Sequence, residues 1–133
     1  MGAQPTRMSA ERQQLGAAGE RAAERCVRRR GYAILARNYR CRLGEVDLVA
    51  LDGRTVVFIE VKTRGGTLVG AALDAVDPRK QRQIARVAEH FVLTHRLEDR
   101  AVRFDVVGVW RDGAALACEL VQDAFAPDGR DRW

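Results

Sequence analysis

Two adjacent segments of the chain carry acidic and basic side chains at a spacing that suits chemistry. Glu45 and Asp47 alternate with apolar residues, and Glu60 and Lys62 do the same after the Asp52-Gly53 turn signal. Because side chains alternate between the two faces of a strand, Glu45 and Asp47 share a face of one predicted strand, and Glu60 and Lys62 share a face of the next. Any hairpin loop of even length then brings all four to the same face of the sheet.

The length of that loop decides which of these groups meet. A two-residue loop at Asp52-Gly53 pairs Glu45 with Glu60, whereas a four-residue loop pairs Asp47 with Glu60 and Glu45 with Lys62. Both registers remain open from the sequence alone.

Carboxylates on neighbouring strands repel each other, and here their sequence neighbours are apolar, as in a buried sheet. One ammonium cannot neutralise three carboxylates, but a divalent cation can. Oxygen ligands from two carboxylates, a backbone carbonyl and water suit Mg²⁺ or Mn²⁺. The pattern therefore predicts a metal site that includes Asp47 and Glu60, with Glu45 as a further acidic candidate.

Lys62 supports the same interpretation. Of the 23 basic residues, 21 are Arg, and Lys62 and Lys80 are the two Lys residues. A compact ammonium next to the carboxylates can orient a nucleophilic water or shift its own pKa, which a guanidinium cannot do. The alternative is a cross-strand ion pair between Lys62 and Glu45.

Periodicity predicts the elements that must position these residues. A helix from Ser9 to Arg30 ends before Gly31, with an apolar stripe at Leu15, Ala18, Ala22 and Cys26, and Gly16 and Gly19 allow a close approach to another element. A second helix starts after Asp77-Pro78 and runs to Leu93 or His95, with a buried stripe at Ile84, Val87, Ala88 and Phe91. Strands are predicted at 32–40, 45–51, 55–63, 102–110 and 116–121.

The resulting order, α-β-β-β-α-β-β, predicts an α/β fold with a central mixed β-sheet of about five strands flanked by helices. The helix between the third and fourth strands implies a parallel pair. A chain of 133 residues suits a single domain. We place it at residues 9–124, between a flexible N-terminal arm (1–8) and a flexible C-terminal tail (125–133).

Composition limits the classes of protein to consider. Hydrophobic residues at 47% and charged residues at 31% exclude a disordered chain and a membrane protein, and no N-terminal segment looks like a signal peptide. Three cysteines without a C-x-x-C pair indicate reduced thiols and a cytoplasmic protein.

The net charge of +5 is unevenly distributed. Residues 1–42 hold ten Arg and three Glu, which is +7, and the remainder holds 13 basic and 15 acidic residues, which is −2. A basic segment on an acidic body indicates a polyanionic partner such as nucleic acid, or else a solvated helix surface. The candidate contacts for the nucleic-acid backbone are Arg40, Arg42, Arg64 and Lys80, the last at the N-terminus of the second helix.

Asp47, followed by twelve residues and Glu60-Val61-Lys62, resembles the D…E-x-K core of the PD-(D/E)XK nuclease superfamily. The chain more closely resembles the YraN family of small bacterial proteins, predicted endonucleases similar to Holliday-junction resolvases. The resemblance covers residues 15 to 120. Its motifs are Gly19-Glu20, Gly31-Tyr32, Arg37-Asn38-Tyr39-Arg40, Gly44-Glu45-Val46-Asp47, Phe58-Ile59-Glu60-Val61-Lys62-Thr63-Arg64 and Lys80-Gln81.

This resemblance implies a restriction-endonuclease-like fold and a set of roles. Asp47 and Glu60 would ligate Mg²⁺ (or Mn²⁺) with the carbonyl of Val61, Lys62 would position or deprotonate the attacking water, and Glu20 would add an acidic group from the first helix. Val46 replaces the proline that precedes the aspartate in the superfamily. The expected function is hydrolysis of DNA phosphodiester bonds at branched or junction DNA.

Two other functions remain open at this point. One is a nucleic-acid-binding protein with a nuclease fold and no catalysis. The other is a protein-interaction domain that dimerises through a sheet edge. Because resolvase-type enzymes pair to cut two strands symmetrically, a homodimer would favour the nuclease.

Overall fold

In the part of the chain that the structure describes, two helices and five strands follow one another in the predicted order. The computed structural model describes residues 7–64 and 76–126, with the side chains of residues 7–15 and of Arg64 excepted. Much of the predicted N-terminal arm and C-terminal tail lies outside these residues. The elements are α1 (Arg7–Arg29), β1 (Ala33–Cys41), β2 (Gly44–Asp52), β3 (Thr55–Arg64), α3 (Pro78–Thr94), β4 (Val102–Asp112) and β5 (Ala115–Val121). Neither helix of the described part is long and apolar enough to cross a membrane.

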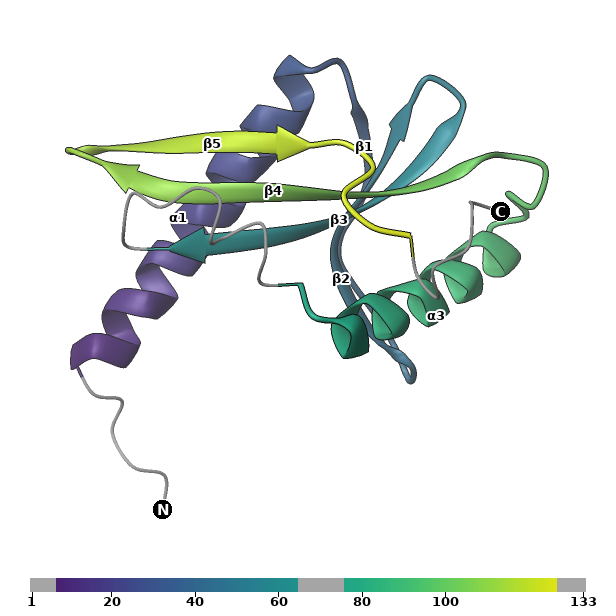
Figure 1. The fold of residues 1–133 in the computed structure, drawn as a ribbon, viewed down its shortest axis with the longest axis horizontal. Helices are drawn as coiled ribbons and strands as arrows, with labels where there is room; N and C mark the ends of the chain where they lie inside the picture. The colour runs from purple at the N-terminus through teal and green to yellow at the C-terminus, as the bar shows by residue number, and fades with distance from the viewer. Residues whose placement is uncertain (1–6, 65–75, 127–133) are drawn as a thin grey trace.

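The strands form one mixed sheet in the order β1-β2-β3-β4-β5 (Figure 1). Strands β3 and β4 are parallel, and the other three neighbouring pairs are antiparallel. The five-stranded mixed sheet and its parallel pair are therefore as predicted. The parallel pair needs a crossover connection, and α3 lies within it.

The β2–β3 hairpin adopts one of the two predicted registers. Asp52 pairs with Thr55 and Leu48 with Ile59, so the next position of this register places Asp47 opposite Glu60. This register is the one that the sequence associated with a four-residue loop. The pairing instead continues through Asp52, and the turn is made by Gly53, with φ +60°, and the residue after it.

Helices α1 and α3 cover opposite faces of the sheet (Figure 1). Each face has its own hydrophobic cluster, because the strands alternate their side chains between the two helices. The buried members on the α3 face include Val49, Val56, Phe58, Ile84, Val87, Phe91 and Phe104. Those on the α1 face include Ala23, Val27, Leu48, Ala50, Val57, Ile59 and Val107.

One residue of β2 breaks the predicted alternation. Val46 was expected on the same face as Leu48, but it packs with Val49 on the α3 face. The break coincides with Asn38 of β1, which has φ +49° and lies opposite Asp47. A left-handed residue interrupts the pleat of its strand. Because of this local irregularity, strict alternation of side chains does not predict the face of the sheet on which Asp47 lies.

The buried stripe of α1 is rotated from the predicted one. Ala23 and Val27 are fully buried, whereas Ala18 and Cys26 are half-buried. The helix also begins at Arg7, so Ser9 does not cap it. A Cβ atom at Gly19 would lie 2.7 Å from Oγ1 of a β3 threonine, Thr63, so α1 approaches β3 closely where it lacks a side chain.

Helix α3 agrees closely with prediction. Asp77 caps it by accepting from the backbone N–H of Lys80 at 2.8 Å, and Pro78 occupies the first turn. The four predicted stripe residues are buried, as is Ala85. At the other end of the domain, Phe125 stacks on Phe104 at 5.3 Å between ring centroids, so packing continues just beyond residue 124.

A buried polar network ties the end of α1 to β4. Asp105 is fully buried and accepts from Arg103 Nε and from the Tyr32 hydroxyl, at 2.9 and 2.8 Å. Arg103 also reaches Asp52, and Gln122 donates to the Tyr32 hydroxyl. Burial raises the pKa of Tyr32 to about 12. Arg103 and Asp105, two residues apart on β4, thus form an ion pair that Tyr32 and Gln122 extend into a network.

The cysteines differ from prediction. Cys26 of α1 and Cys118 of β5 form a disulfide, with their Cα atoms 6.4 Å apart, while Cys41 is free. The prediction of three reduced thiols is therefore wrong for this pair. The spacing of 92 residues gave no local signal, because only the packing of α1 across the sheet brings the two sulfur atoms together.

Candidate active site

Asp47 lies where strands β2 and β3 separate. Their backbone pairing ends at Leu48 and Ile59, and the Asp47 Oδ2 atom then accepts from the backbone N–H of Val61 at 2.7 Å. The side chain of Asp47 thus makes a contact that a neighbouring backbone carbonyl would otherwise make. The expected use of the Val61 carbonyl as a metal ligand is compatible with this contact, which occupies only the amide.

Glu60 provides the second carboxylate. It is one of two buried charged residues among those described, with an exposed fraction of 5%. Its Oε2 atom lies 3.7 Å from the Nζ atoms of both Lys62 and Lys80. Lys62 comes from the same strand and Lys80 from the first turns of α3, so a strand and a helix supply one ammonium each to a single carboxylate oxygen.

These two carboxylates interact unfavourably when both are ionised. Burial, together with the hydrogen bond and negative charge of Asp47, raises the pKa of Glu60 from 4.5 to about 8, although Lys80 and Lys62 act in the opposite direction. Two ammonium groups at 3.7 Å therefore do not compensate for burial and for the second carboxylate. A buried carboxylate that its surroundings stabilise incompletely favours either a proton or a bound cation.

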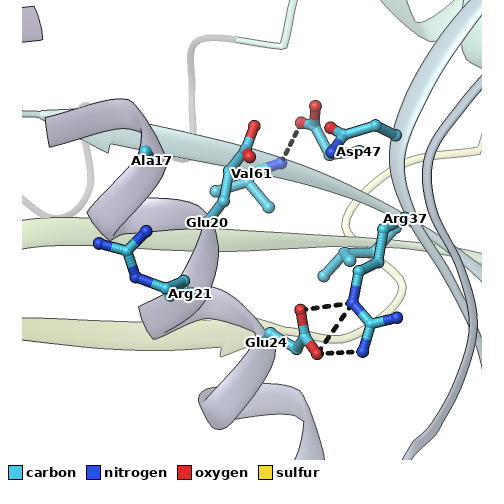
Figure 2. Close-up of a pocket in the computed structure, with 9 residues that line it drawn as sticks. Ala17, Glu20, Arg21, Glu24, Arg37, Asp47 and Val61 are labelled. Atoms are coloured by element: carbon cyan, nitrogen blue, oxygen red, sulfur yellow. Dashed lines mark hydrogen bonds and ion pairs between the residues drawn. The ribbon is translucent and has the colours of Figure 1, made fainter. Parts of the chain in front are cut away.

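A cavity of about 310 Å³ opens beside Asp47, between α1 and strands β1 and β2 (Figure 2). Glu20 projects into it from α1, toward the strands that carry Asp47 and Val61 (Figure 2). This is the position expected for an acidic group from the first helix. The remaining lining residues are Ala17, Arg21, Glu24, Arg37, Asn38 and Leu48.

The structure brings together Asp47, Glu60, Lys62 and Lys80, with Glu20 across the adjoining cavity. It does not bring Glu45 to them: Glu45 is half exposed and pairs with Arg40 at 2.9 Å. The alternative Glu45–Lys62 ion pair is therefore also wrong.

The residues predicted to contact the nucleic-acid backbone do not form one cluster. Arg40 is exposed on β1, and Arg42 is exposed in the turn that follows it. Arg64 ends β3, with its side chain outside the described part of the chain. Among the predicted nucleic-acid contacts whose side chains the structure describes, Lys80 is the one within the carboxylate cluster.

We tested whether this site suits Mg²⁺. Residues 7–64 and 76–126 contain no cluster of three or more His, Cys, Asp or Glu side chains. However, Mg²⁺ commonly takes one or two carboxylates and keeps several waters. Asp47 and Glu60 are hard oxygen donors whose mutual repulsion a cation would relieve. The donor set therefore fits a partly hydrated Mg²⁺ or Mn²⁺.

Gly44 and Gln83 position Lys80, a role that was not predicted. Gln83 accepts from Lys80 Nζ at 3.2 Å, and its side chain lies over Gly44, where an added Cβ would come within 2.7 Å of it. Gly44 has φ +142°, which also favours glycine. In the sequence, the glycine of the Gly44-Glu45-Val46-Asp47 motif was the one sign of this contact. Its partner, Gln83, lies on another element, so the motif alone did not identify it.

A second unpredicted feature is the ion pair between Arg37 and Glu24. Arg37 Nε lies 3.0 and 2.9 Å from the two Glu24 carboxylate oxygens, and Arg37 holds the pKa of Glu24 below its usual value. Both residues line the cavity next to Asp47 (Figure 2). Arg37 is in one of the motifs noted above, but its role was not predicted.

The fold and the site define a mixed α/β domain with a cluster of two carboxylates and two lysines at the edge of a strand pair. Comparison with known proteins gives the family. Residues 19–109 match the family described as "Uncharacterised protein family UPF0102", and the chain belongs to it.

Curated relatives have the same family name, and the match covers nearly the whole length of each relative described here. A UPF0102 protein of Caldicellulosiruptor saccharolyticus is 42% identical over 86% of this chain and 98% of its own. Those of Moorella thermoacetica and Symbiobacterium thermophilum are 42% and 47% identical, over 89% and 84% of this chain and 100% and 95% of theirs.

Proposed function

We propose that this protein is a metal-dependent endonuclease that hydrolyses phosphodiester bonds of DNA and has a restriction-endonuclease-like fold. The observation that carries the proposal is the meeting of Asp47 and Glu60 with Lys62 and Lys80 where β2 and β3 diverge. The strand order, with one parallel pair and a helix on each face, supports the fold assignment.

The chain's own residues divide the work as follows. Asp47 and Glu60 would hold the cation, with a contribution from the Val61 carbonyl. The bound Mg²⁺ would neutralise charge on the phosphate and favour ionisation of an attacking water. Glu60 would be ionised as a ligand, because a nearby positive charge lowers the pKa of a carboxyl group.

Lys62 and Lys80 would then be available to the substrate and the attacking water. With Glu60 acting as a ligand, the Lys62 ammonium would orient the attacking water, and the Lys80 ammonium would contact a phosphate oxygen. Lys80 lies in the first turn of α3, where the helix dipole favours anions. Glu20, facing Asp47 across the cavity, would accept a hydrogen bond from a water in the site.

The partner is expected to be DNA, with branched or junction DNA as the proposed substrate on the family resemblance. Arg40 and Arg42 are exposed near the β1–β2 turn and would contact the backbone. A homodimer would let two sites cut two strands.

The experiment measures cleavage of a panel of linear, flapped and four-way-junction DNA with Mg²⁺ or Mn²⁺. Parent cleavage that Asp47→Asn and Lys62→Ala each abolish supports the proposal. Glu119→Gln, a change at an exposed carboxylate on β5, is the matched control and should leave cleavage unchanged. Binding of the panel without cleavage under any metal would instead favour the non-catalytic nucleic-acid-binding function.

A further inference from the structure

The ion pair between Glu24 and Arg37 lies in the wall of the cavity beside Asp47 (Figure 2). Glu24 comes from α1 and Arg37 from β1, and the guanidinium contacts both carboxylate oxygens. The side chain of Arg37 is 54% exposed and that of Glu24 21% exposed. Because more than half of the Arg37 side chain is exposed, another anion can approach the guanidinium and compete with Glu24.

Arg37 is placed to reach a group bound at Asp47. Its Cα pairs with that of Leu48, the residue next to Asp47, across the β1–β2 ladder. The next residue of β1, Asn38, has φ +49° and also lines the cavity. The cavity has roughly the volume of ten water molecules, so it can hold a phosphate group with part of its hydration shell.

The chemistry of the pair identifies the ligand class. A guanidinium presents parallel N–H donors that match the oxygens of a carboxylate or of a phosphate. Glu24 therefore occupies the position that a phosphate group would take on Arg37. No described carboxylate other than Glu24 pairs with Arg37.

We infer that Arg37 is a phosphate-binding residue of the candidate site, and that Glu24 is an internal competitor which a nucleic-acid phosphate displaces. This inference rests on the proposed function, because it takes the ligand to be the DNA backbone. It adds Arg37 of β1 as a contact to the substrate, and it makes Glu24 of α1 a residue that weakens binding of the substrate.

The inference predicts opposite effects for the two partners. Glu24→Gln releases Arg37 and should tighten binding of a fluorescent DNA duplex about 3-fold or more, while Arg37→Gln should weaken it about 10-fold. Binding is measured by anisotropy in EDTA at fixed low salt, so that cleavage does not contribute. Arg37→Lys keeps the charge, loses the paired donors and should bind with intermediate affinity.

Two control variants separate this effect from general electrostatics. Asp99→Asn changes the charge by the same amount as Glu24→Gln, and it releases Arg54, which lies 3.6 Å from Asp99 at the β2–β3 turn. Arg28→Gln removes the other arginine that pairs with Glu24, one that does not line the cavity. Each control should change the affinity by about 2-fold or less.

The result that overturns the inference is equality with the controls: Glu24→Gln matching Asp99→Asn, or Arg37→Gln and Arg37→Lys both matching Arg28→Gln. Circular dichroism establishes that each variant is folded. Failure of the proposed function is separate, because parent protein that binds DNA but cleaves none refutes hydrolysis without affecting this comparison. Parent protein that binds no DNA refutes both.

Discussion

The buried carboxyl of Glu60 should make the metal-free protein less stable as the pH rises. Burial and Asp47 raise its pKa from 4.5 to about 8. Between those two pH values the folded chain holds a proton that the unfolded chain has released. The free energy of unfolding therefore falls as the pH increases through this window, because the folded state binds more protons there.

The size of the effect follows from the pKa difference. A tenfold change in proton affinity corresponds to about 1.4 kcal/mol, so the shift of Glu60 corresponds to at most about 5 kcal/mol. Relaxation and water entry reduce such values in real proteins, and we expect about 2 kcal/mol. Glu60→Gln removes the titrating group, so its stability relative to the parent should improve by that amount between about pH 5 and about pH 9.

The assay is urea unfolding in EDTA across this pH range, followed by circular dichroism. Comparing the variant with the parent at each pH cancels pH effects that do not depend on Glu60, because both proteins share them. Glu119→Gln is the control, since Glu119 is exposed and its substitution should give a difference that does not depend on pH. A Glu60→Gln difference that is equally flat would refute the assignment of a raised pKa to this carboxyl.

The remaining predictions concern the packing of α1 on β3 and the buried network around Asp105. Gly19→Ala should destabilise the protein by about 1–3 kcal/mol in thermal or urea unfolding, because its Cβ would meet a β3 side chain at 2.7 Å. Gly16→Ala, with nothing within 4 Å, should stabilise the same helix by about 0.5–1 kcal/mol, and equal effects would contradict the close approach. Asp105→Asn should cost roughly 3 kcal/mol because it leaves Arg103 without its buried partner, and an unchanged urea midpoint would contradict this role.

The fold was predictable to a large degree because its signals are local. Turn residues, the Asp77-Pro78 helix start and apolar periodicity located both helices and all five strands to within a few residues. The parallel β3–β4 pair followed from the helix between those strands. The buried face of α1 was predicted less accurately, because its alanines and glycines form several possible stripes of similar hydrophobicity.

The candidate site was predictable in part. Asp47, Glu60 and Lys62 were identified from alternation and hairpin register, and the structure brings them together. Glu45 was assigned to the same face by alternation, but it is exposed beside Arg40. The left-handed Asn38 opposite Asp47 interrupts the pleat between them, and alternation carries no information beyond such a break.

The order of the elements, and which strands carry the acidic and basic residues, follow from the sequence, because hydrophobic periodicity and turn chemistry act over a few residues. Three contacts follow only from the packed fold: Lys80 of α3 approaches Glu60, Arg37 pairs with Glu24, and Cys26 bonds to Cys118. These contacts join elements far apart in the chain. They depend on the rotation and separation of helices packed on a sheet, which the packing of side chains sets and sequence spacing does not encode.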